Sequence, residues 1–544
     1  MLMLPAALGA LSVLNACGGG SAAGPTGPGT SPTPAVPTDV VTYKYDVQRT
    51  GQNLTESVLT PANVSASTFG LLRNLAVDGK VDAQPLYLSK LVVAGVAHNT
   101  VFIATENGSV YAFDSDTGTL LWKVSLLGSG ETASDSQNCS DVAPQIGITS
   151  TPVIDRGAGP HGTLFAVAMS RDTAASFHQR LHALDVTTGA EMTGSPKDIA
   201  ATYHSTSFMP GQYEERAALL LSNGTIYTTW ASHCDTAPYG GWVIAYSEST
   251  LGQTGVLNLA PGAAGMGFAS QGPAIWMSGG GPAADAAGNV YLITGNGRFE
   301  TTLDANGFPS GGDYGDSFVK ISASAGALAV ADYFALSNGL SESANDVDLG
   351  SGGIMLLPDL TDGAGTVRHL AVGAGKDGNL YVVSRDAMGK FSATANNIWQ
   401  ELDGALSGGV WSTPAWFGGS VYYGPVGGTL RSFSVTNASL SGAAVSQTPT
   451  SFVYPGTLPV ISANGSANAI VWAYENATQA VLHAYDAGNL ARELYNSTQA
   501  PHYRDQFGTG NKFIVPTVAD GKVFVATTNS VAVFGLLPLD ADPQ

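Results

Sequence analysis

The sequence predicts an all-β fold, an eight-bladed β-propeller, and three observations support this prediction. A strand–turn–strand unit recurs along the 544-residue chain. Glycine (68 residues) and proline (28 residues) are frequent, which is typical of many short strands joined by tight turns. Hydrophobic residues make up 44% of the chain and charged residues only 12%, so the chain is too apolar to be disordered. Repeats that stack side by side favour one large ring over several separate domains.

The clearest unit is Val101–Trp122, which reads VFIATENGSVYAFDSDTGTLLW. An apolar strand is followed by Asn107-Gly108 and a second strand, and Asn-Gly between apolar runs is the strongest short-range hairpin signal. The next turn, Asp114 to Gly118, imitates part of a calcium loop but lacks the downstream glutamate. We therefore interpret it as a turn of the propeller.

Weaker copies of this unit follow along the chain, at Leu164–Gly189, Thr225–Thr250, Val290–Gly326, His369–Gly389, Ser420–Val435, Ala469–Gly488 and Lys522–Leu536. The last copy leaves no room for an outer strand. We expect the early segment Thr42–Val81 to supply that strand and to close the ring, because closure removes a free sheet edge.

Four regions are expected: a signal (1–16), a Gly/Ser/Pro/Thr-rich flexible tether (17–40), the propeller (41–538) and a short tail (539–544). Leu14-Asn15-Ala16-Cys17 resembles a bacterial lipoprotein signal, which implies that Cys17 carries a lipid. No lysine or arginine precedes the apolar run, whereas a normal signal carries a basic n-region, so either the true start lies upstream of Met1 or the resemblance is fortuitous. An ordinary secretory signal is the alternative to the lipoprotein signal.

These features predict an exported cell-envelope lipoprotein, periplasmic or on the outer membrane or cell surface, that is anchored by a lipid and monomeric. Because the net charge is −20 and basic runs are missing, nucleic-acid binding is excluded. Three cysteines are too few for a disulfide-dense scaffold. With Cys17 lipidated, Cys139 and Cys234 are the remaining thiols, and export predicts that they form a disulfide.

The pattern A-x-D-x-x-T-G-x-x-x-W, from Ala112 to Trp122, resembles the repeat of pyrroloquinoline quinone (PQQ)-type propellers. That group includes quinoprotein alcohol dehydrogenases and an outer-membrane assembly lipoprotein of the same fold. The resemblance covers about Thr42 to Leu537 and implies that Trp122 docks between adjacent blades.

The same resemblance implies a cofactor site. Trp276 would form the floor under the quinone, and Asn296, in Thr294-Gly295-Asn296-Gly297, would bind Ca²⁺ through oxygen. Lys376 would touch the quinone and stabilise negative charge on it, and Trp411 would be a further aromatic residue of the pocket. The alternative is that these residues serve only packing and turns.

In the dehydrogenases an aspartate acts as general base, and Asn345-Asp346-Val347-Asp348 stands at the matching place. We assign the role to Asp346, with Asp348 as the other candidate and ordinary loop acids as the alternative. The glutamate that binds calcium in the family is missing after Leu164–Met169, and Asp172 is the substitute that the resemblance offers. The adjacent-cysteine disulfide of those enzymes is also missing.

Two classes of function stay open. One is an oxidoreductase that oxidises an alcohol or sugar, a small-molecule substrate, with PQQ and Ca²⁺. The other is a non-catalytic scaffold that binds proteins or polymers at the membrane surface. Trp276, Asn296 and Lys376 favour the first class, and we expect them to converge with Asp346 and Trp411. The missing glutamate and the missing haem motif favour the second class.

Overall fold

The computed structural model describes residues 39–262, 271–324 and 326–538. The predicted signal, Cys17, the tether up to residue 38 and the tail lie outside these residues. In the described part of the chain, no helix is long and apolar enough to cross a membrane.

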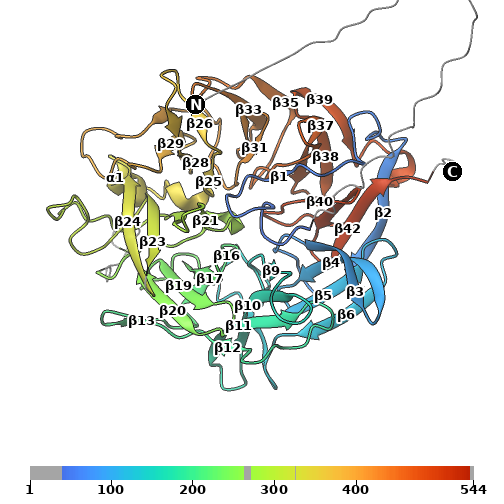
Figure 1. Cartoon of the computed structure of the whole chain (residues 1–544), viewed down its shortest axis with the longest axis horizontal. Helices are drawn as coiled ribbons and strands as arrows, with labels where there is room; N and C mark the ends of the chain where they lie inside the picture. Colours follow the sequence, from blue (N-terminus) through green and yellow to red (C-terminus); the bar gives the residue numbers. More distant parts are fainter. Residues whose placement is uncertain (1–38, 263–270, 325, 539–544) are drawn as a thin grey trace, which may run out of the picture. The chain divides into compact units, whose positions relative to one another are not determined.

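Within the described residues, eight antiparallel sheets with four main strands each are arranged around a common centre (Figure 1). The strands of each blade are given from the centre outward. The first blade consists of β3 (Leu86–Val93), β4 (Val96–Ala104), β5 (Ser109–Asp114) and β6 (Leu120–Ser125), and the second of β9 (Val153–Asp155), β10 (Thr163–Arg171), β11 (Phe177–Asp185) and β12 (Lys197–Asp198). The third blade consists of β16 (Leu220–Ser222), β17 (Thr225–Thr229), β19 (Trp242–Ser247) and β20 (Gln253–Asn258), and the fourth of β21 (Ala283–Ala284), β22 (Val290–Ile293), β23 (Ser317–Ser324) and β24 (Ala327–Ala335).

The fifth blade consists of β25 (Met355–Leu356), β28 (Leu370–Gly373), β29 (Leu380–Ser384) and β30 (Gln400–Leu402), and the sixth of β31 (Ala415–Phe417), β32 (Ser420–Tyr423), β33 (Thr429–Thr436) and β35 (Ser446–Ser451). The seventh blade consists of β36 (Val460–Asn464), β37 (Ala467–Glu475), β38 (Val481–Asp486) and β39 (Asn489–Asn496), and the eighth of β40 (Thr517–Ala519), β41 (Lys522–Ala526), β42 (Ser530–Leu536) and β2 (Phe69–Ala76). The predicted eight-bladed all-β propeller is therefore confirmed.

Short elements fill the connections between the blades. The strands are β1 (Gln52–Asn53), β7 (Thr132–Asp135), β8 (Gln145–Ile146), β13 (Thr202–Tyr203), β14 (Thr206–Ser207), β15 (Tyr213–Glu214), β18 (Ala231–Ser232), β26 (Leu360–Thr361), β27 (Val367–Arg368) and β34 (Ser439–Leu440). The helical pieces are α1 (Gly339–Ala344) and the 3₁₀ turns η2 (Met277–Gly279), η3 (Leu349–Ser351) and η4 (Pro501–Tyr503).

The ring closes through the N-terminal part of the chain, as the sequence predicts. Strand β2 pairs with β42 in antiparallel register, from Phe69 opposite Leu536 to Ala76 opposite Ser530. The blade that holds the C-terminal strands thus obtains its outer strand from a segment more than 400 positions away. This closure removes the free edge that β42 would otherwise expose.

Trp122 docks between the first two blades, as the family resemblance implies. Its indole Nε1–H donates to the carbonyl of Val186, 3.0 Å away, in the second blade. A Cβ at Gly189 would lie 2.7 Å from the indole ring, so this position has room for glycine alone. The repeat motif thereby couples one blade to the next.

We expect Trp122→Phe to lower the free energy of unfolding by about 1–3 kcal/mol, because the Val186 carbonyl then lies buried without its donor. Urea unfolding followed by tryptophan fluorescence measures this change. Trp399→Phe is a parallel test on the fifth blade, since its indole donates in the same way to the carbonyl of Ala438 in the sixth blade. An unchanged free energy of unfolding in Trp122→Phe would contradict the docking role of Trp122.

The segment Asp39–Leu54, here called the inner clasp, lies along the inner edges of the blades. Its backbone exchanges hydrogen bonds with inner strands of six blades, at Tyr87, Ile154, Ala284, Leu356, Trp416 and Ile461. Two side chains reach the remaining blades: Arg49 donates to the carbonyl of Leu219 and Asn53 donates to that of Val518. The clasp satisfies inner-edge groups that would otherwise lie buried and unpaired.

Two cations of the inner clasp are fully buried. Arg49 donates to the carbonyls of Tyr43, Pro282 and Leu219 and to the Thr42 hydroxyl, at 2.8–3.0 Å. Lys44 Nζ donates to the carbonyls of Thr413, Pro414 and Pro459. Burial lowers the pKa of Arg49 to about 10, so the guanidinium stays charged at neutral pH.

Candidate functional site

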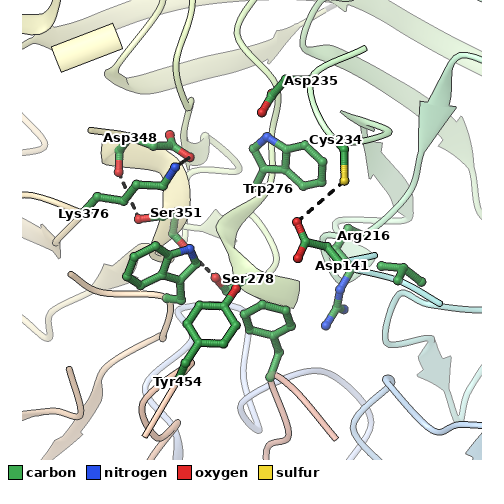
Figure 2. Close-up of a pocket in the computed structure, with 13 residues that line it drawn as sticks. Asp141, Arg216, Cys234, Asp235, Trp276, Ser278, Asp348, Ser351, Lys376 and Tyr454 are labelled. Atoms are coloured by element: carbon green, nitrogen blue, oxygen red, sulfur yellow. Dashed lines mark hydrogen bonds and ion pairs between the residues drawn. The ribbon is translucent and has the colours of Figure 1, made fainter. Parts of the chain in front are cut away.

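Loops from several blades enclose one cavity near the centre of the ring (Figure 2). The residues that line it are Asp141, Val142, Arg216, Cys234, Asp235, Trp276, Ser278, Asp348, Ser351, Lys376, Trp411, Tyr454 and Phe513. A propeller brings such distant positions together because the loops of neighbouring blades meet around the axis.

A cluster of acids and one amide lies at one side of the cavity. The backbone N–H of Asn296 donates to Asp348 Oδ1 at 3.0 Å, and Asn296 Nδ2 donates to Asp346 Oδ1 at 2.6 Å. A Cβ at Gly295 would lie 2.5 Å from Asp348 Oδ1, which explains the glycine before Asn296. Asn296 is 5% exposed, and no described residue forms a hydrogen bond with its Oδ1.

Lys376 neutralises part of this cluster. Its Nζ donates to Asp346 Oδ1 at 2.6 Å and lies 3.9 Å from Asp348 Oδ2. Burial lowers the pKa of Lys376, but the carboxylates of Asp348 and Asp346 outweigh burial and hold this pKa above its ordinary value. The amine therefore stays protonated and supplies a fixed positive charge beside the cavity.

Burial raises the pKa of two acids in this cluster, Asp348 and Asp316. Burial raises the pKa of Asp348 to about 6, against the opposing effect of Lys376. Burial and the neighbouring Asp348 raise the pKa of Asp316 well above its ordinary value, and Ser343 donates to its carboxylate. Asp348 is therefore an ionised base near neutral pH, whereas the environment of Asp316 favours its neutral form.

Aromatic rings form another side of the cavity. Trp411 and Tyr454 meet edge to face with ring centroids 5.6 Å apart, and Tyr454 meets Phe513 in the same way at 6.3 Å. The Lys376 ammonium lies 5.9 Å from the Trp411 ring and the Arg216 guanidinium 5.4 Å from the Phe513 ring. A row of three aromatic rings thus has a positively charged side chain near each end.

Arg216 has an unusual hydrogen-bonding state. It is 4% exposed, and its Nη1 donates to the carbonyl of Thr149 at 3.1 Å. Its Nη2 finds no hydrogen-bond partner among the residues that the structure describes. A buried guanidinium nitrogen without an acceptor is costly, so this atom favours a ligand that offers an acceptor.

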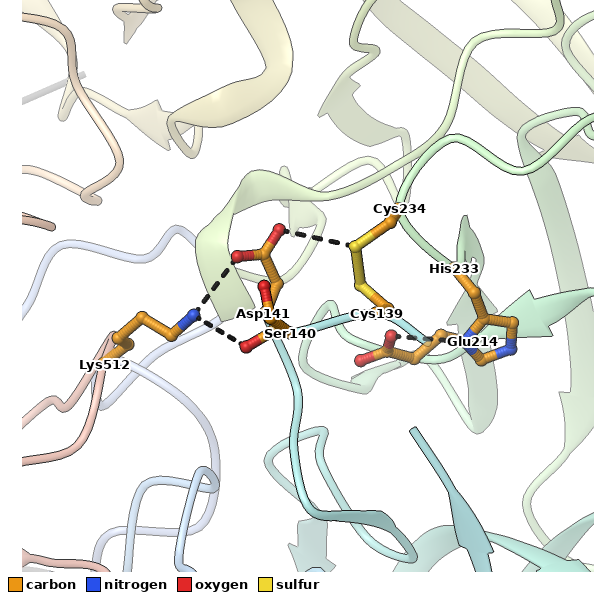
Figure 3. The surroundings of a disulfide bond; sticks show 7 residues. All are labelled: Cys139, Ser140, Asp141, Glu214, His233, Cys234 and Lys512. Carbon is orange, nitrogen blue, oxygen red and sulfur yellow. Dashed lines mark hydrogen bonds and ion pairs between the residues drawn. A yellow bond between two sulfur atoms is a disulfide. The ribbon is translucent and has the colours of Figure 1, made fainter. Parts of the chain in front are cut away.

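The predicted disulfide between Cys139 and Cys234 is confirmed, with Cα atoms 5.3 Å apart (Figure 3). It joins the β7–β8 loop to the loop after β18. Asp141 lies beside it: its Oδ2 is 3.9 Å from Cys234 Sγ, and its Oδ1 accepts from Lys512 Nζ at 3.1 Å. The bond holds the two loops that carry Asp141 and Asp235 at the cavity.

The structure brings together most residues that the sequence singled out. Trp276, Lys376 and Trp411 line the cavity, and Asn296 and Asp346 join them through hydrogen bonds. Asp348, the second candidate base, lines the cavity itself, whereas Asp346 does not.

Asp172, the suggested metal ligand, does not join this group. Its Oδ1 accepts from the backbone N–H groups of Ala174 and Ser176, within the turn between β10 and β11. Its Oδ2 lies 3.3 Å from His178 Nε2. The carboxylate thus stabilises its own hairpin.

Sequence reasoning missed several residues of the cavity. Arg216, Asp141, Asp235, Tyr454 and Phe513 come from connections between blades, where the repeat pattern is interrupted. Asp141 and Asp235 follow the two paired cysteines closely, and this proximity was the one signal that could have indicated them.

Comparison with known proteins agrees with this architecture. A family model described as outer membrane protein assembly factor BamB matches residues 43–190 and 81–228. A quinohemoprotein alcohol dehydrogenase from Comamonas testosteroni shares 15% identity with a TM-score of 0.60, over 94% of this chain and 83% of that one. The fold is that of the PQQ-like β-propellers.

Two further solved structures share this propeller fold. The quinohemoprotein alcohol dehydrogenase ADHIIG from Pseudomonas putida HK5 has 16% identity and a TM-score of 0.61, over 92% of this chain and 80% of that one. A europium-containing methanol dehydrogenase has 14% identity and a TM-score of 0.56, over 92% and 98%. No curated protein sequence matches the chain. At such identities the likeness shows the PQQ-like propeller fold alone.

Proposed function

We propose that this propeller is an exported oxidoreductase that oxidises an alcohol or sugar with PQQ and a hard cation such as Ca²⁺. The observation that carries the proposal is a pair of buried polar atoms: Arg216 Nη2, in the lining of the aromatic cavity, and Asn296 Oδ1, in a residue that is hydrogen-bonded to the lining residue Asp348. Within the described residues, neither Asn296 Oδ1 nor Arg216 Nη2 has a hydrogen-bond partner. Asn296 Oδ1 is an oxygen ligand of the kind that Ca²⁺ prefers, and Arg216 Nη2 can donate a hydrogen bond to a carboxylate of a planar ligand.

The residues in and beside the cavity are suited to bind PQQ and Ca²⁺. PQQ is a planar, polyacidic quinone, and when bound it supplies two-electron oxidation. Trp276 offers an aromatic face, while Arg216 and Lys376 offer positive charge to carboxylate or quinone oxygens. Asn296 Oδ1 and the Asp346 carboxylate would hold the cation. Asp172 lies outside this donor set.

Asp348 is better suited than Asp346 to the role of base. It lines the cavity, its pKa of about 6 leaves it ionised at neutral pH, and its Oδ1 is held by the N–H groups of Asn296 and Gly350. A held, ionised carboxylate accepts the hydroxyl proton of a bound alcohol. Asp346 instead orients Lys376 and Asn296 through its Oδ1.

The free volume of the cavity is about 100 Å³, below the range of ~300–1,000 Å³ usual for ligand pockets. A three-ring cofactor therefore requires the cavity to widen. Tyr454 lines the cavity and is 41% exposed, so its ring has room to move outward into solvent.

A second candidate function is a non-catalytic propeller that binds proteins or polymers. The observation that favours it is the ion pair of Lys376 with Asp346, because this ammonium already neutralises a carboxylate that a cation would need. The narrow cavity points in the same direction.

Export and anchoring are part of the proposal. The Cys139–Cys234 disulfide is suited to an oxidising compartment outside the cytoplasm, such as the periplasm or cell surface. Cys17 would carry the lipid that anchors the body to a membrane, and the body would be monomeric.

The proposal is tested by mixing the purified protein with PQQ, Ca²⁺ and an electron-accepting dye, then adding alcohols and sugars. We expect substrate-dependent dye reduction that requires PQQ and disappears when a chelator removes Ca²⁺. Trp276→Ala should lose this activity. If no alcohol or sugar causes dye reduction, the oxidoreductase proposal is wrong and the scaffold function remains.

A further inference from the structure

The hairpin between β3 and β4 ends in an exposed apolar tip, Val92–Ala97, which reads VVAGVA. Val92 is 58% exposed and Val96 is 57% exposed, so both side chains face solvent. An uninterrupted run of exposed apolar residues is unusual on a soluble domain, because each of these side chains forgoes the free energy of burial. The run therefore indicates a surface that a partner covers.

Three other blades make the same two-residue turn between their first two strands, but with residues suited to it. Their central residues are Asn223-Gly224 in the third blade, Gly418-Gly419 in the sixth and Asp520-Gly521 in the eighth. In the first blade they are Ala94-Gly95, with φ of 49° and 84°. Asparagine, aspartate and glycine favour this left-handed turn, whereas alanine is disfavoured there. The first blade thus keeps an apolar residue at a position where the backbone favours a polar one.

Two exposed side chains on neighbouring blades extend this apolar surface. Leu54, 41% exposed, lies at the tip of the seventh blade, where its carbonyl accepts from the Gly465 N–H at 2.7 Å. Val58, 43% exposed, lies at the tip of the eighth blade, since a Cβ at Gly521 would be 2.8 Å from its Cγ1. The seventh, eighth and first blades follow one another around the ring (Figure 1). Leu54, Val58 and Val92–Ala97 are here called the apolar patch.

The apolar patch lies at the opposite end of the strands from the cavity. The residues that line the cavity stand in connections that lead into an inner strand or that join the second strand of a blade to the third. Trp411 before β31 and Lys376 between β28 and β29 are examples of these two kinds. The tips join the inner strand to the second strand, so they lie at the other end. A partner on the apolar patch therefore leaves the cavity accessible.

The chain enters the propeller beside the apolar patch. Asp39, the first described residue, accepts through Oδ1 from the backbone N–H and the hydroxyl of Ser89, both at 2.8 Å. Its Oδ2 accepts from Arg156, which lies in the corresponding tip of the second blade. Ser89 stands three positions before Val92 in β3. The segment that leads to Cys17 therefore joins the body on the face that carries the apolar patch.

We propose that the apolar patch contacts a phospholipid membrane surface, with Val92 and Val96 entering its interfacial layer. Interfacial binding strengthens with the apolar area that is buried, and a tip beside the point of attachment would orient an anchored body. Because the net charge is −20, insertion of apolar side chains, and not attraction to anionic headgroups, is the source of binding. This inference does not depend on the oxidoreductase function and shares with it only the membrane location.

The binding test uses the full chain as Cys17→Ser, so that the patch is measured without a lipid anchor. Flotation with phosphatidylcholine vesicles should recover this protein. The change Val92→Ser/Val96→Ser should lower its partition coefficient by about tenfold or more, because two largely exposed valines lose their transfer into an apolar layer. Val445→Ser/Val453→Ser is the matched control, with valines that are 57% and 51% exposed outside the patch, and it should float like its parent.

A second readout locates the tip. In the Cys17→Ser chain the two remaining cysteines form the disulfide, so Val96→Cys can carry one environment-sensitive fluorophore. Its emission should shift to the blue with vesicles, whereas a label at Asn223→Cys, in the same turn of the third blade, should not shift. Equal flotation of the tip variant and its parent, or equal shifts at both labels, would overturn the inference. Dimerisation that the tip variant abolishes, without flotation, would assign the patch to a second copy of this chain instead.

Discussion

Arg49→Met lowers the free energy of unfolding by roughly 3–9 kcal/mol, because three buried carbonyls lose their donor at about 1–3 kcal/mol each. These carbonyls belong to Tyr43, Pro282 and Leu219, so one side chain ties the inner clasp to the edges of the third and fourth blades. Urea unfolding followed by tryptophan fluorescence measures the change.

Arg492→Met is the matched control for this prediction. Arg492 is exposed and pairs with Asp486 at 3.0 Å on the surface, where an ion pair contributes about 1 kcal/mol or less. If Arg49→Met were as stable as Arg492→Met, the clasp would not be needed to hold the ring together.

Asp348→Asn lowers dye-linked oxidation by about 10²–10⁴-fold, the usual contribution of a general base. The amide oxygen can still accept from the N–H groups of Asn296 and Gly350, so the loop conformation and the binding of PQQ should be kept. Asp346→Asn is the comparison on the same loop. If Asp346→Asn were inactive while Asp348→Asn kept its activity, Asp346 and not Asp348 would be the general base.

The same assignment predicts a pH dependence. Because the pKa of Asp348 is raised to about 6, the carboxylate is ionised above pH 6 and accepts a proton there. Below its pKa the carboxylate becomes protonated, and a cation held by Asp346 would lower that pKa, so the oxidation rate should fall with decreasing pH at pH 6 or below. A pH–rate profile measures this fall, and a residual rate in Asp348→Asn that still decreases near pH 6 would contradict the assignment.

The repeats predicted the blades well because each blade is a local structure. In Val101–Trp122 the hairpin, the Asp114 turn and the docking tryptophan lie within a short stretch of sequence. The closing strand was also predictable, since the last repeat lacked an outer strand and an unassigned segment remained near the N-terminus. The structure narrows that segment to Phe69–Ala76.

The inner clasp was not predictable. It follows no strand or helix periodicity, and Lys44, Tyr45 and Arg49 adopt left-handed backbone conformations with φ of 56°, 74° and 66°. Such conformations are disfavoured locally and persist because the surrounding blades fix them. Its partners lie on all eight blades, so no local pattern records them.

The site was predictable in part. Trp276, Asn296 and Lys376 keep short motifs that resemble those of the family, and the structure brings them together. Arg216 and Tyr454 carry no motif, because a cavity wall built from connections between blades depends on tertiary arrangement. Asp172 illustrates the opposite case, since its position suggested a ligand while its hydrogen bonds belong to a turn.

An equilibrium titration of the metal-depleted protein with PQQ, in the presence and absence of Ca²⁺, tests most directly whether the cavity is a cofactor site. Quenching of tryptophan fluorescence and a shift of the quinone absorption report binding. We expect saturation at one PQQ per chain, tighter with Ca²⁺, and binding at least about tenfold weaker in Arg216→Gln, which loses a charge-assisted contact of roughly 1.5–3 kcal/mol. The exposed Arg492→Gln should bind like the wild type. Binding that does not saturate, or that is equal in both variants, would contradict a cofactor site in this cavity.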